Sequence, residues 1–265
     1  MLKITNLEII FNPGDINQVH ALNNINLLLP PGEFVTVIGS NGAGKSTLLN
    51  TVAGVFAPIT GQILIDNQDV TDWPEYRRAT MVSRVFQNPL MGTAASMTIE
   101  QNLTLAIKRG QQRGLRIGVT AQRREQFRDA LAHFGLGLEN RLDAKVNLLS
   151  GGQRQALTLL MATLARPKIL LLDEHTAALD PATAHRIVQL TMQIIEETQL
   201  TTLMVTHNMR QALDMGTRTI MMHEGEILFD FSGQGRDDLT VPKLLRMFSE
   251  VRRQELADDR LLLAD

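Results

Sequence analysis

The stretch "GSNGAGKST", residues 39–47, fits the pattern G-x-x-x-x-G-K-[ST] of a phosphate-binding loop. The apolar run "FVTVI" before it predicts a short buried strand, and "KSTLLNTVAG" after it predicts a helix that ends at Gly54. Glycines allow the backbone to approach phosphate oxygens closely, and the N–H groups of a helix N-terminus attract anions. We therefore expect this loop to bind a nucleotide, with Lys45 at the β- and γ-phosphates and Ser46 at Mg²⁺.

Every residue of this loop is a candidate for nucleotide contact, through its backbone or its side chain. The candidates are Gly39, Ser40, Asn41, Gly42, Ala43, Gly44, Lys45, Ser46 and Thr47. The alternative is a glycine-rich turn that binds nothing. Strand, motif and helix occur together in the required order, so the sequence favours the nucleotide site.

A second stretch, "LLLDEHTAALD" at residues 170–180, ends an apolar run in two adjacent carboxylates, Asp173 and Glu174. Burying two carboxylates side by side is costly without a positive partner. Strands of this kind end in an Asp that helps to hold Mg²⁺, so Asp173 fits a metal ligand, with the metal and Lys45 supplying the positive charge. Glu174 is then free to accept a proton from the attacking water, or to orient it. The alternative is a surface strand end with two solvated acids.

Composition limits the class of protein. The chain has 265 residues, is 44% hydrophobic, carries a formal net charge of −2 and contains no cysteine. The charge argues against a nucleic-acid binder that works by bulk charge, and the lack of cysteine excludes disulfides and thiolate metal sites. No apolar run reaches about 18 residues, so we expect no membrane span and no signal peptide.

The order of elements predicts an α/β fold. Residues 168–172 and 201–205 read as buried strands, with a helix at 181–197 between them, and this alternation implies a mostly parallel sheet with helices on both faces. Residues 1–30 read as strands near a sheet edge, and we expect helices between about 88 and 152.

Short signals refine this order. Turns at Asp66-Asn67 and Glu224-Gly225 predict hairpins, and "MVSRVF" predicts a strand. The helical tail after Thr240 is indicated by the spacing of Leu244, Phe248 and Val251. A basic patch in the helical stretch reads as a solvated helix face, or as a surface that faces a membrane. It consists of Lys108, Arg109, Arg113, Arg116, Arg123 and Arg124.

The stretch "LSGGQRQALTLLMATLARP", residues 149–167, predicts a second helix N-terminus that is open to an anion. Ser150 is a good N-cap, and Gly151 and Gly152 leave the first turn bare. One buried face is expected for Ala156, Leu159, Leu160, Thr163 and Leu164. An ordinary capped helix remains the alternative.

"LSGGQ" resembles the signature motif of the ATP-binding cassette (ABC) ATPases, and the other motifs of that family follow in order over nearly the whole chain. Gln87 resembles the glutamine that contacts Mg²⁺ and water, and "ILLLDE" resembles the Walker B strand with its catalytic glutamate. "ALD" at Asp180 resembles the D-loop, and His207 resembles the switch histidine at the γ-phosphate. Phe11 stands where the family has an aromatic residue that stacks on adenine.

The resemblance implies a fold and two sets of site residues. The fold is a P-loop NTPase core with a mostly parallel sheet, an antiparallel β edge subdomain and an inserted α-helical subdomain. A single domain would span 1–265, with a nucleotide-binding core at 1–87 and 153–239, a helical signature subdomain at 88–152 and a tail at 240–265. The implied catalytic set is Glu174, His207 and Lys45. The implied metal set is Ser46, Gln87 and Asp173.

The resemblance also implies partners. Two such ATPases pair head to tail, so Ser150, Gly151, Gly152 and Gln153 would serve the nucleotide of a second, identical subunit. A separate transmembrane permease would dock at residues 87–103, where Leu90 and Met91 look exposed. "LLLDEHTAALDP" and its neighbouring motifs resemble ATPases that work with tryptophan/tyrosine-type binding lipoproteins, which implies amino-acid uptake. The chain would then lie at the cytoplasmic face of the plasma membrane, as a peripheral subunit.

Other interpretations are less consistent with the sequence. A soluble ABC ATPase acting on DNA would carry a long coiled coil, and one acting on the ribosome would usually hold two cassettes. A GTPase would carry an N-K-x-D motif, and a kinase would not need the signature helix. One departure from the family pattern is His175, where proline is usual. It is either a tolerated substitution or a hydrogen-bonding group near the γ-phosphate.

Overall fold

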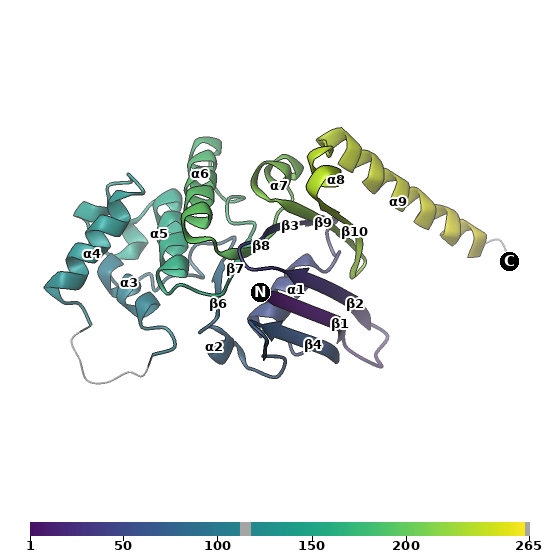
Figure 1. Ribbon diagram of the computed structural model, residues 1–265, viewed down its shortest axis with the longest axis horizontal. Coiled ribbons are helices and arrows are strands. Elements are labelled where there is room, and N and C mark those ends of the chain that lie inside the picture. Colours follow the sequence, from purple (N-terminus) through teal and green to yellow (C-terminus); the bar gives the residue numbers. More distant parts are fainter. Residues whose placement is uncertain (112–117, 263–265) are drawn as a thin grey trace.

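A six-stranded sheet forms the centre of the molecule, and its strand order is β10-β9-β3-β8-β7-β6 (Figure 1). The computed structural model describes residues 1–111 and 118–262. The strands are β3 (Phe34–Gly39), β6 (Val82–Val85), β7 (Ile169–Asp173), β8 (Thr201–Val205), β9 (Arg218–His223) and β10 (Glu226–Ser232). All neighbours pair in parallel except β9 and β10. β7 and β8 are almost wholly buried, as expected for apolar strands covered on both faces, and the predicted mostly parallel sheet is confirmed.

A second sheet is antiparallel, with the order β2-β1-β4-β5. It consists of β1 (Leu2–Phe11), β2 (Val19–Leu29), β4 (Thr60–Ile65) and β5 (Gln68–Asp69). The hairpin between β4 and β5 turns at Asp66 and Asn67, whose φ values of 48° and 63° suit a tight two-residue turn. The predicted edge strands and this turn are therefore confirmed.

Helix α1 (Lys45–Ala53) lies between the two sheets. Its Leu48, Leu49 and Val52 are fully buried in a core cluster that contains residues of both sheets. Gly54 ends the helix in a left-handed conformation, as predicted. Arg78 of α2 (Glu75–Arg78) is buried at this end and donates to the carbonyls of Thr51 at 2.5 Å and Val52 at 3.1 Å. A guanidinium at a helix C-terminus is electrostatically favourable, so Arg78 stabilises the C-terminal end of α1. The N-terminus of α1 faces the loop 39–44.

Helices between residues 88 and 198 pack to one side of the six-stranded sheet (Figure 1). They are α3 (Ile99–Ile107), α4 (Ala121–Ala132), α5 (Gly151–Leu164) and α6 (Pro181–Thr198), with short 3₁₀ turns at Leu138–Asn140 and Val146–Leu148. A second core cluster joins these helices to Val85, Leu170 and Leu172 of the sheet. The proposed division of the chain between residues 152 and 153 stays a prediction.

Helix α5 is buried more widely than the sequence predicts. Ala156, Leu159 and Leu160 of the expected face are buried, whereas Thr163 and Leu164 are only partly buried. Leu157, Thr158, Met161 and Ala162 are buried as well. The physical reason is that α5 packs against α3, α6 and β6 at once, so it has no broad solvent-facing side.

The basic residues of the helical stretch do not form one open face. Arg109 donates to Ser83 Oγ at 2.9 Å, and Arg124 pairs with Glu100 at 2.5 Å. Arg113 and Arg116 lie outside the described residues.

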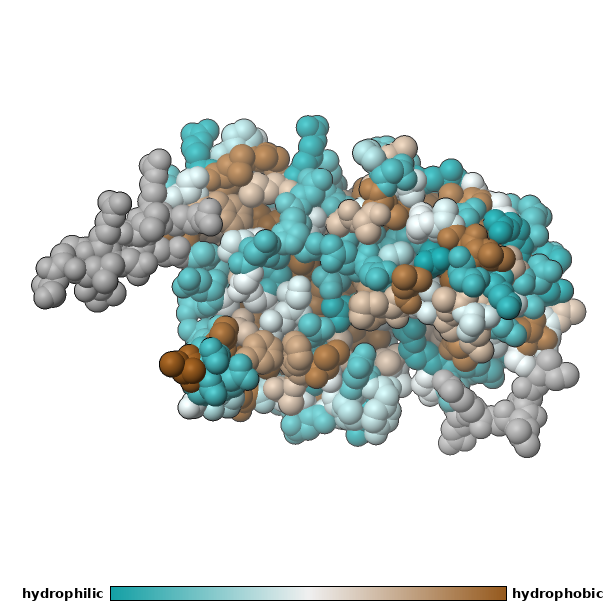
Figure 2. Space-filling model, turned by 180° about the vertical axis from the view of Figure 1, so that it is seen from behind, coloured by the Kyte–Doolittle hydropathy of each residue, from teal (hydrophilic) through white to brown (hydrophobic). Residues whose placement is uncertain are grey.

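The C-terminal part consists of α7 (Met209–Met215), α8 (Gly233–Asp237) and α9 (Val241–Leu262). Leu244 is buried in a third cluster and Phe248 packs against it, which confirms the helical spacing of the tail. On the face in Figure 2, hydrophilic residues cover most of the surface and apolar residues lie in scattered groups. Within the described ranges, no helix is both long and apolar enough to cross a bilayer.

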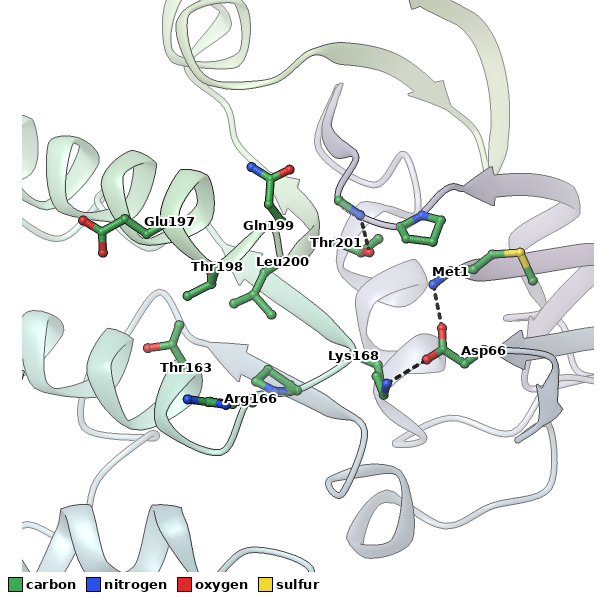
Figure 3. A pocket seen from close by; sticks show the side chains of 13 residues that line it. Met1, Asp66, Thr163, Arg166, Lys168, Glu197, Thr198, Gln199, Leu200 and Thr201 are labelled. Atoms are coloured by element: carbon green, nitrogen blue, oxygen red, sulfur yellow. Dashed lines mark hydrogen bonds and ion pairs between the residues drawn. The ribbon is translucent and has the colours of Figure 1, made fainter. Parts of the chain in front are cut away.

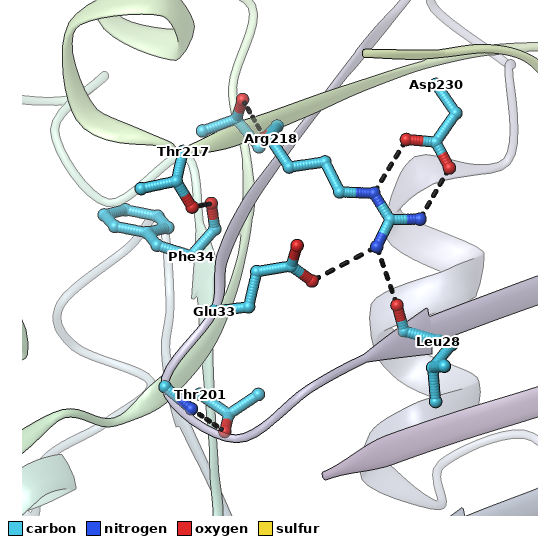
Figure 4. A network of polar contacts seen from close by, with 9 residues as sticks. Leu28, Glu33, Phe34, Thr201, Thr217, Arg218 and Asp230 are labelled. Atoms are coloured by element: carbon cyan, nitrogen blue, oxygen red, sulfur yellow. Dashed lines mark hydrogen bonds and ion pairs between the residues drawn. The ribbon is translucent and has the colours of Figure 1, made fainter. Parts of the chain in front are cut away.

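Arg218 joins the two sheets (Figure 4). From β9 its guanidinium binds both carboxylate oxygens of Asp230, at 2.7 and 2.5 Å. It also donates to Glu33 Oε2 at 3.1 Å and to the carbonyl of Leu28, on β2, at 2.7 Å. Hydrogen bonds to Asp230 and the charge of that carboxylate raise the pKa of Arg218. The largely buried guanidinium therefore holds the antiparallel sheet against the six-stranded sheet.

We expect Arg218→Met to lower the free energy of unfolding by about 2–4 kcal/mol, because it leaves two acids and a carbonyl without a donor. Urea unfolding followed by circular dichroism measures this. Arg210→Met is the matched control, since Arg210 pairs with Asp214 at 3.8 Å with both side chains largely exposed. It should change stability by less than about 0.5 kcal/mol. Equal effects for the two variants would contradict the structural role of Arg218.

Candidate functional site

A cavity of ≈ 310 Å³ opens where the carboxyl ends of β3, β7 and β8 meet. In parallel sheets the loops that follow these ends form the usual ligand site. The lining residues are Phe11, Val19, Ala21, Asn41, Gly42, Ala43, Gly44, Lys45, Ser46, Thr47, Glu174 and His207. The structure thus brings most of the predicted loop, the predicted base and the predicted switch histidine to one cavity.

The loop 39–44 has the geometry of an anion cradle. Gly44 has φ 90°, and a Cβ there would lie 2.4 Å from the carbonyl oxygen of Ala21, so only glycine fits. No side chain caps the N-terminus of α1. The first N–H groups of the helix therefore remain available to an anion, and the helix dipole favours one.

Lys45 lies inside this cradle. It is buried, and its Nζ donates to the carbonyls of Gly39 at 2.8 Å and Ser40 at 2.6 Å. Burial lowers the pKa of Lys45 from its ordinary value, and the charge of Glu174 opposes that shift. The Lys45 ammonium is desolvated and, within the described part of the chain, binds only neutral carbonyl groups. A phosphate group would give it an anionic partner.

The oxygen donors near the loop suit Mg²⁺. This ion takes one or two carboxylates and completes its shell with hydroxyls, waters and phosphate oxygens. Ser46 and Asp173 provide a hydroxyl and a carboxylate at neighbouring strand and helix ends. Among the described residues, no group of three His, Cys, Asp or Glu side chains forms a self-contained metal site.

Asp173 has a partner that the sequence does not single out. Arg84 Nη2 lies 2.5 Å from Asp173 Oδ2, and Arg84 Nη1 donates to Asn50 Oδ1 at 2.6 Å. Both charged side chains are about nine-tenths buried, at 13% and 15% exposure. The positive charge that Asp173 requires therefore comes from β6, besides any metal. The only signal in the sequence is a lone charge inside the apolar strand "MVSRVF".

Glu174 is held at the edge of the cavity by groups from three segments. Its Oε1 lies 2.5 Å from His207 Nε2, and Gln87 Nε2 donates to its Oε2 at 3.3 Å. Its own N–H donates to Val205 O at 2.9 Å, and its φ of 45° is left-handed. Such a backbone conformation is costly for a non-glycine residue and is often found at functional positions. Two members of the predicted catalytic set, Glu174 and His207, are therefore in contact, and Gln87, predicted to contact Mg²⁺ and water, joins them. Their roles stay predictions.

Phe11 lines the cavity, as its proposed adenine contact requires, and packs edge-on against Phe56 with the ring centres 5.2 Å apart. Ser40 Oγ lies 3.4 Å from His223 Nδ1, a loop contact that no sequence motif indicates.

His175 points away from the nucleotide cavity, so the hypothesis that it hydrogen-bonds near the γ-phosphate is wrong. The side chain is buried, and its Nε2 lies 3.2 Å from Thr191 Oγ1 on α6. The Thr191 hydroxyl already donates to Ile187 O at 2.7 Å, so its oxygen must accept from His175, which fixes the Nε2–H tautomer. Burial lowers the pKa of His175 to about 4. This histidine is thus a neutral core residue.

The signature residues do not line this cavity. Ser150 and Gln153 form a capping box at the start of α5, and Ser150 and Gly151 are exposed. Asp180 caps α6 by accepting from Thr183 N at 3.1 Å, and the hydrogen bonds from Thr183 lower the pKa of Asp180. Within one chain Ser150, Gln153 and Asp180 therefore cap helices, and Gln153 Nε2 also donates to Leu136 O at 3.2 Å.

A larger cavity of ≈ 470 Å³ lies at the opposite edge of the sheet, beside the first residues of β7 and β8 (Figure 3). Its Asp66 is bound by the α-amino group of Met1 at 2.8 Å and by Lys168 at 3.1 Å. Because these charges neutralise one another and no motif residue lies there, we place the functional site at the smaller cavity.

Comparisons with known proteins agree with this site. A family model described as ABC transporter matches residues 22–177. A tyrosine transport ATP-binding protein of Clostridioides difficile (strain R20291) is 46% identical over 250 residues, covering 94% of this chain and 98% of that protein. A thiamine import ATP-binding protein of Yersinia pseudotuberculosis serotype I (strain IP32953) is 39% identical over 246 residues, covering 92% and 95%. A solved dimeric ATP-binding cassette in a post-hydrolysis state, bound to ADP and Pi, has a TM-score of 0.74 and 31% identity, covering 88% and 98%.

The pKa of His175 predicts a pH-dependent stability. It is about 4 in the folded chain and about 6.5 in the unfolded chain, so the unfolded state binds more protons between these values. The stabilising contribution is complete above pH 6.5 and is lost as the pH falls toward 4, by about 3 kcal/mol in total. His175→Gln lacks this titration. Urea unfolding at pH 7.5 and 5.0 should show a steeper loss for the parent chain, and parallel losses would refute the assignment.

Proposed function

The chain belongs to the ABC transporter family, and we propose that it is the subunit that hydrolyses ATP to drive solute import through a membrane permease. One observation carries the proposal. His207 and Gln87, which come from two other segments, both contact Glu174 at the rim of a cavity built by the phosphate-binding loop.

The geometry supports hydrolysis to ADP and phosphate. A water molecule at the γ-phosphate would lie near the Glu174 carboxylate, which accepts its proton while His207 and Gln87 fix the orientation of that carboxylate. Lys45 offers a buried positive charge for the phosphates, and Phe11 a ring for the adenine. Mg²⁺ would be held by Ser46, Gln87 and Asp173, and when bound it neutralises charge on the phosphates.

A second copy of the chain would complete each site. Ser150, Gly151, Gly152 and Gln153 sit at an exposed helix N-terminus outside the cavity of their own chain, so we assign them to the nucleotide of an identical partner. A dimeric cassette with the same fold supports this arrangement. The pairing is head to tail, with ATP between the two chains.

The permease partner would dock at residues 87–103. Leu90 and Met91 are 49% and 69% exposed there, next to Gln87 of the hydrolytic site. We place the chain at the cytoplasmic face of the plasma membrane as a peripheral subunit, with a substrate-binding lipoprotein as a further component. A soluble ATPase acting on DNA or the ribosome is not favoured, because the relatives are ATP-binding proteins of transport systems.

The cargo is a small solute, and an amino acid is the first candidate. The relative described as a tyrosine transport ATP-binding protein is 46% identical over 94% of this chain, and a thiamine import protein is 39% identical. Uptake assays with the permease of this system would distinguish an aromatic amino acid from thiamine.

We expect Glu174→Gln to lower the hydrolysis rate by about 10²–10⁴-fold, because it removes the proton acceptor while it keeps the shape of the side chain. ATP affinity should stay within about threefold, and ATP-bound dimers should accumulate. Single-turnover hydrolysis, equilibrium nucleotide binding and size-exclusion chromatography measure the three effects. Glu196→Gln, exposed at the far end of α6, is the matched control. A Glu174→Gln chain that hydrolyses ATP within a few-fold of the parent would exclude Glu174 as the base.

We expect Met91→Glu and Leu90→Glu to weaken association with the permease and to uncouple hydrolysis from transport, because they place charge in an apolar contact. ATP hydrolysis by the isolated chain should not change. Leu245→Glu, at an equally exposed leucine on α9, is the control. Co-purification in detergent and transport in vesicles report the effect. Unchanged association and transport for both variants would exclude this docking segment.

A further inference from the structure

We propose that Gln155 is a positioning residue that holds the Gln87 and Glu174 segments together and ties both to helix α5. The proposal rests on the hydrolytic function assigned above. Gln155 lies in the second turn of α5, and its side chain is fully buried. It therefore contacts neither nucleotide nor solvent, and its influence on hydrolysis must act through the groups that it binds.

Two backbone carbonyls share the Gln155 amide. Its Nε2 donates to His175 O at 2.6 Å and to Phe86 O at 3.2 Å. A side-chain NH₂ group carries two protons, so both hydrogen bonds form at once. Since both partners are acceptors, the amide cannot be flipped without losing both, and its orientation is determined by the contacts. Its Oε1 is buried and has no hydrogen-bond partner among the described residues.

Each of these carbonyls belongs to the neighbour of a hydrolytic residue. Phe86 precedes Gln87, and His175 follows Glu174. The side chains of Gln87 and Glu174 then meet at 3.3 Å. One buried amide therefore sets the distance between two segments that are 87 residues apart in sequence and whose side chains must cooperate at the water.

Hydrogen bonds hold the turn after Glu174, including those from Ala177 N–H to Glu174 O at 2.9 Å and from Gln211 Nε2 to Thr176 Oγ1 at 3.1 Å. Position 175 carries histidine rather than a proline that would fix φ. The His175 side chain binds Thr191 on α6, while its carbonyl binds Gln155 on α5. Hydrogen bonds thus connect the turn to two helices, and Gln155 provides the hydrogen bond from α5.

Helix α5 connects Gln155 to the exposed signature residues at its own N-terminus. The same helix begins at the exposed Ser150, where the partner's nucleotide is proposed to bind. Less than two turns separate that N-terminus from Gln155, and a helix of this length moves as one body. A shift of α5 at the partner's nucleotide would therefore move the carbonyls beside this chain's own Glu174 and Gln87.

Gln155→Met tests the proposal, because methionine keeps the length of the side chain and removes both donors. We expect kcat for ATP hydrolysis to fall at least tenfold while the nucleotide Kd stays within about twofold. We also expect hydrogen exchange in the nucleotide-free chain to become faster at residues 84–90 and 172–178. Gln155→Asn, which keeps the amide but is too short to reach both carbonyls, should give smaller changes of the same kind.

Thr158→Val is the matched control. Thr158 is buried on the same helix and donates to Gln155 O at 2.8 Å, so the variant loses a hydrogen bond of α5 without touching the two carbonyls. If kcat falls in proportion to the melting temperature in both Gln155→Met and Thr158→Val, the positioning role is overturned. Normal kcat together with normal hydrogen exchange in Gln155→Met would also overturn it. A parent chain without ATPase activity would refute the proposed function, and the exchange measurement would then still decide the role of Gln155.

Discussion

Parallel pairing of β3, β8 and β7 is the constraint on which the site depends. The register places Asp173 beside Val205 and Val37 beside Val205, so the strand ends lie at the same edge. Loops that leave this edge bring the phosphate-binding loop, the acidic pair and His207 within reach of one another. Because the strands are apolar and buried on both faces, a shift of register would move a charged residue at a strand end, such as Asp173, into the core. The core therefore enforces the geometry of the site.

Charge at this edge is balanced by protein groups in pairs. Arg84 neutralises Asp173, while His207 and Gln87 bind the two oxygens of Glu174. Lys45 binds backbone carbonyls instead of a carboxylate. Removing a carboxylate from water is costly unless such partners are present. The two neighbouring acids consequently occupy distinct environments, which is what different chemical roles require.

Two arginines outside the cavity stabilise the elements that carry the phosphate-binding loop. Arg78 binds the carbonyl end of α1, and Arg218 joins the turn before β3 to both sheets. Each guanidinium makes several hydrogen bonds in a fixed plane, which a lysine could not reproduce. The phosphate-binding loop connects β3 to α1. The end of each element that is remote from the loop is therefore bound by an arginine.

The sequence by itself determines the order of strands and helices and the phosphate-binding loop, and it singles out Glu174 and His207 as candidates. These features are local: glycines at fixed spacing, apolar runs of strand length, and polar residues at strand ends. The structure confirms the α/β architecture, the two hairpins and the convergence of Glu174 and His207 on one cavity.

Only the tertiary structure decides which partners the buried polar groups take. Arg84 and Asp173 lie 89 residues apart, and the β6–β7 register that brings them together cannot be read from either strand alone. The His175 side chain points into the core because it binds Thr191 on α6. The extensive burial of α5 results from its packing against three neighbouring elements. Long-range packing selects such contacts, because a buried polar group must find its partner wherever the fold provides one.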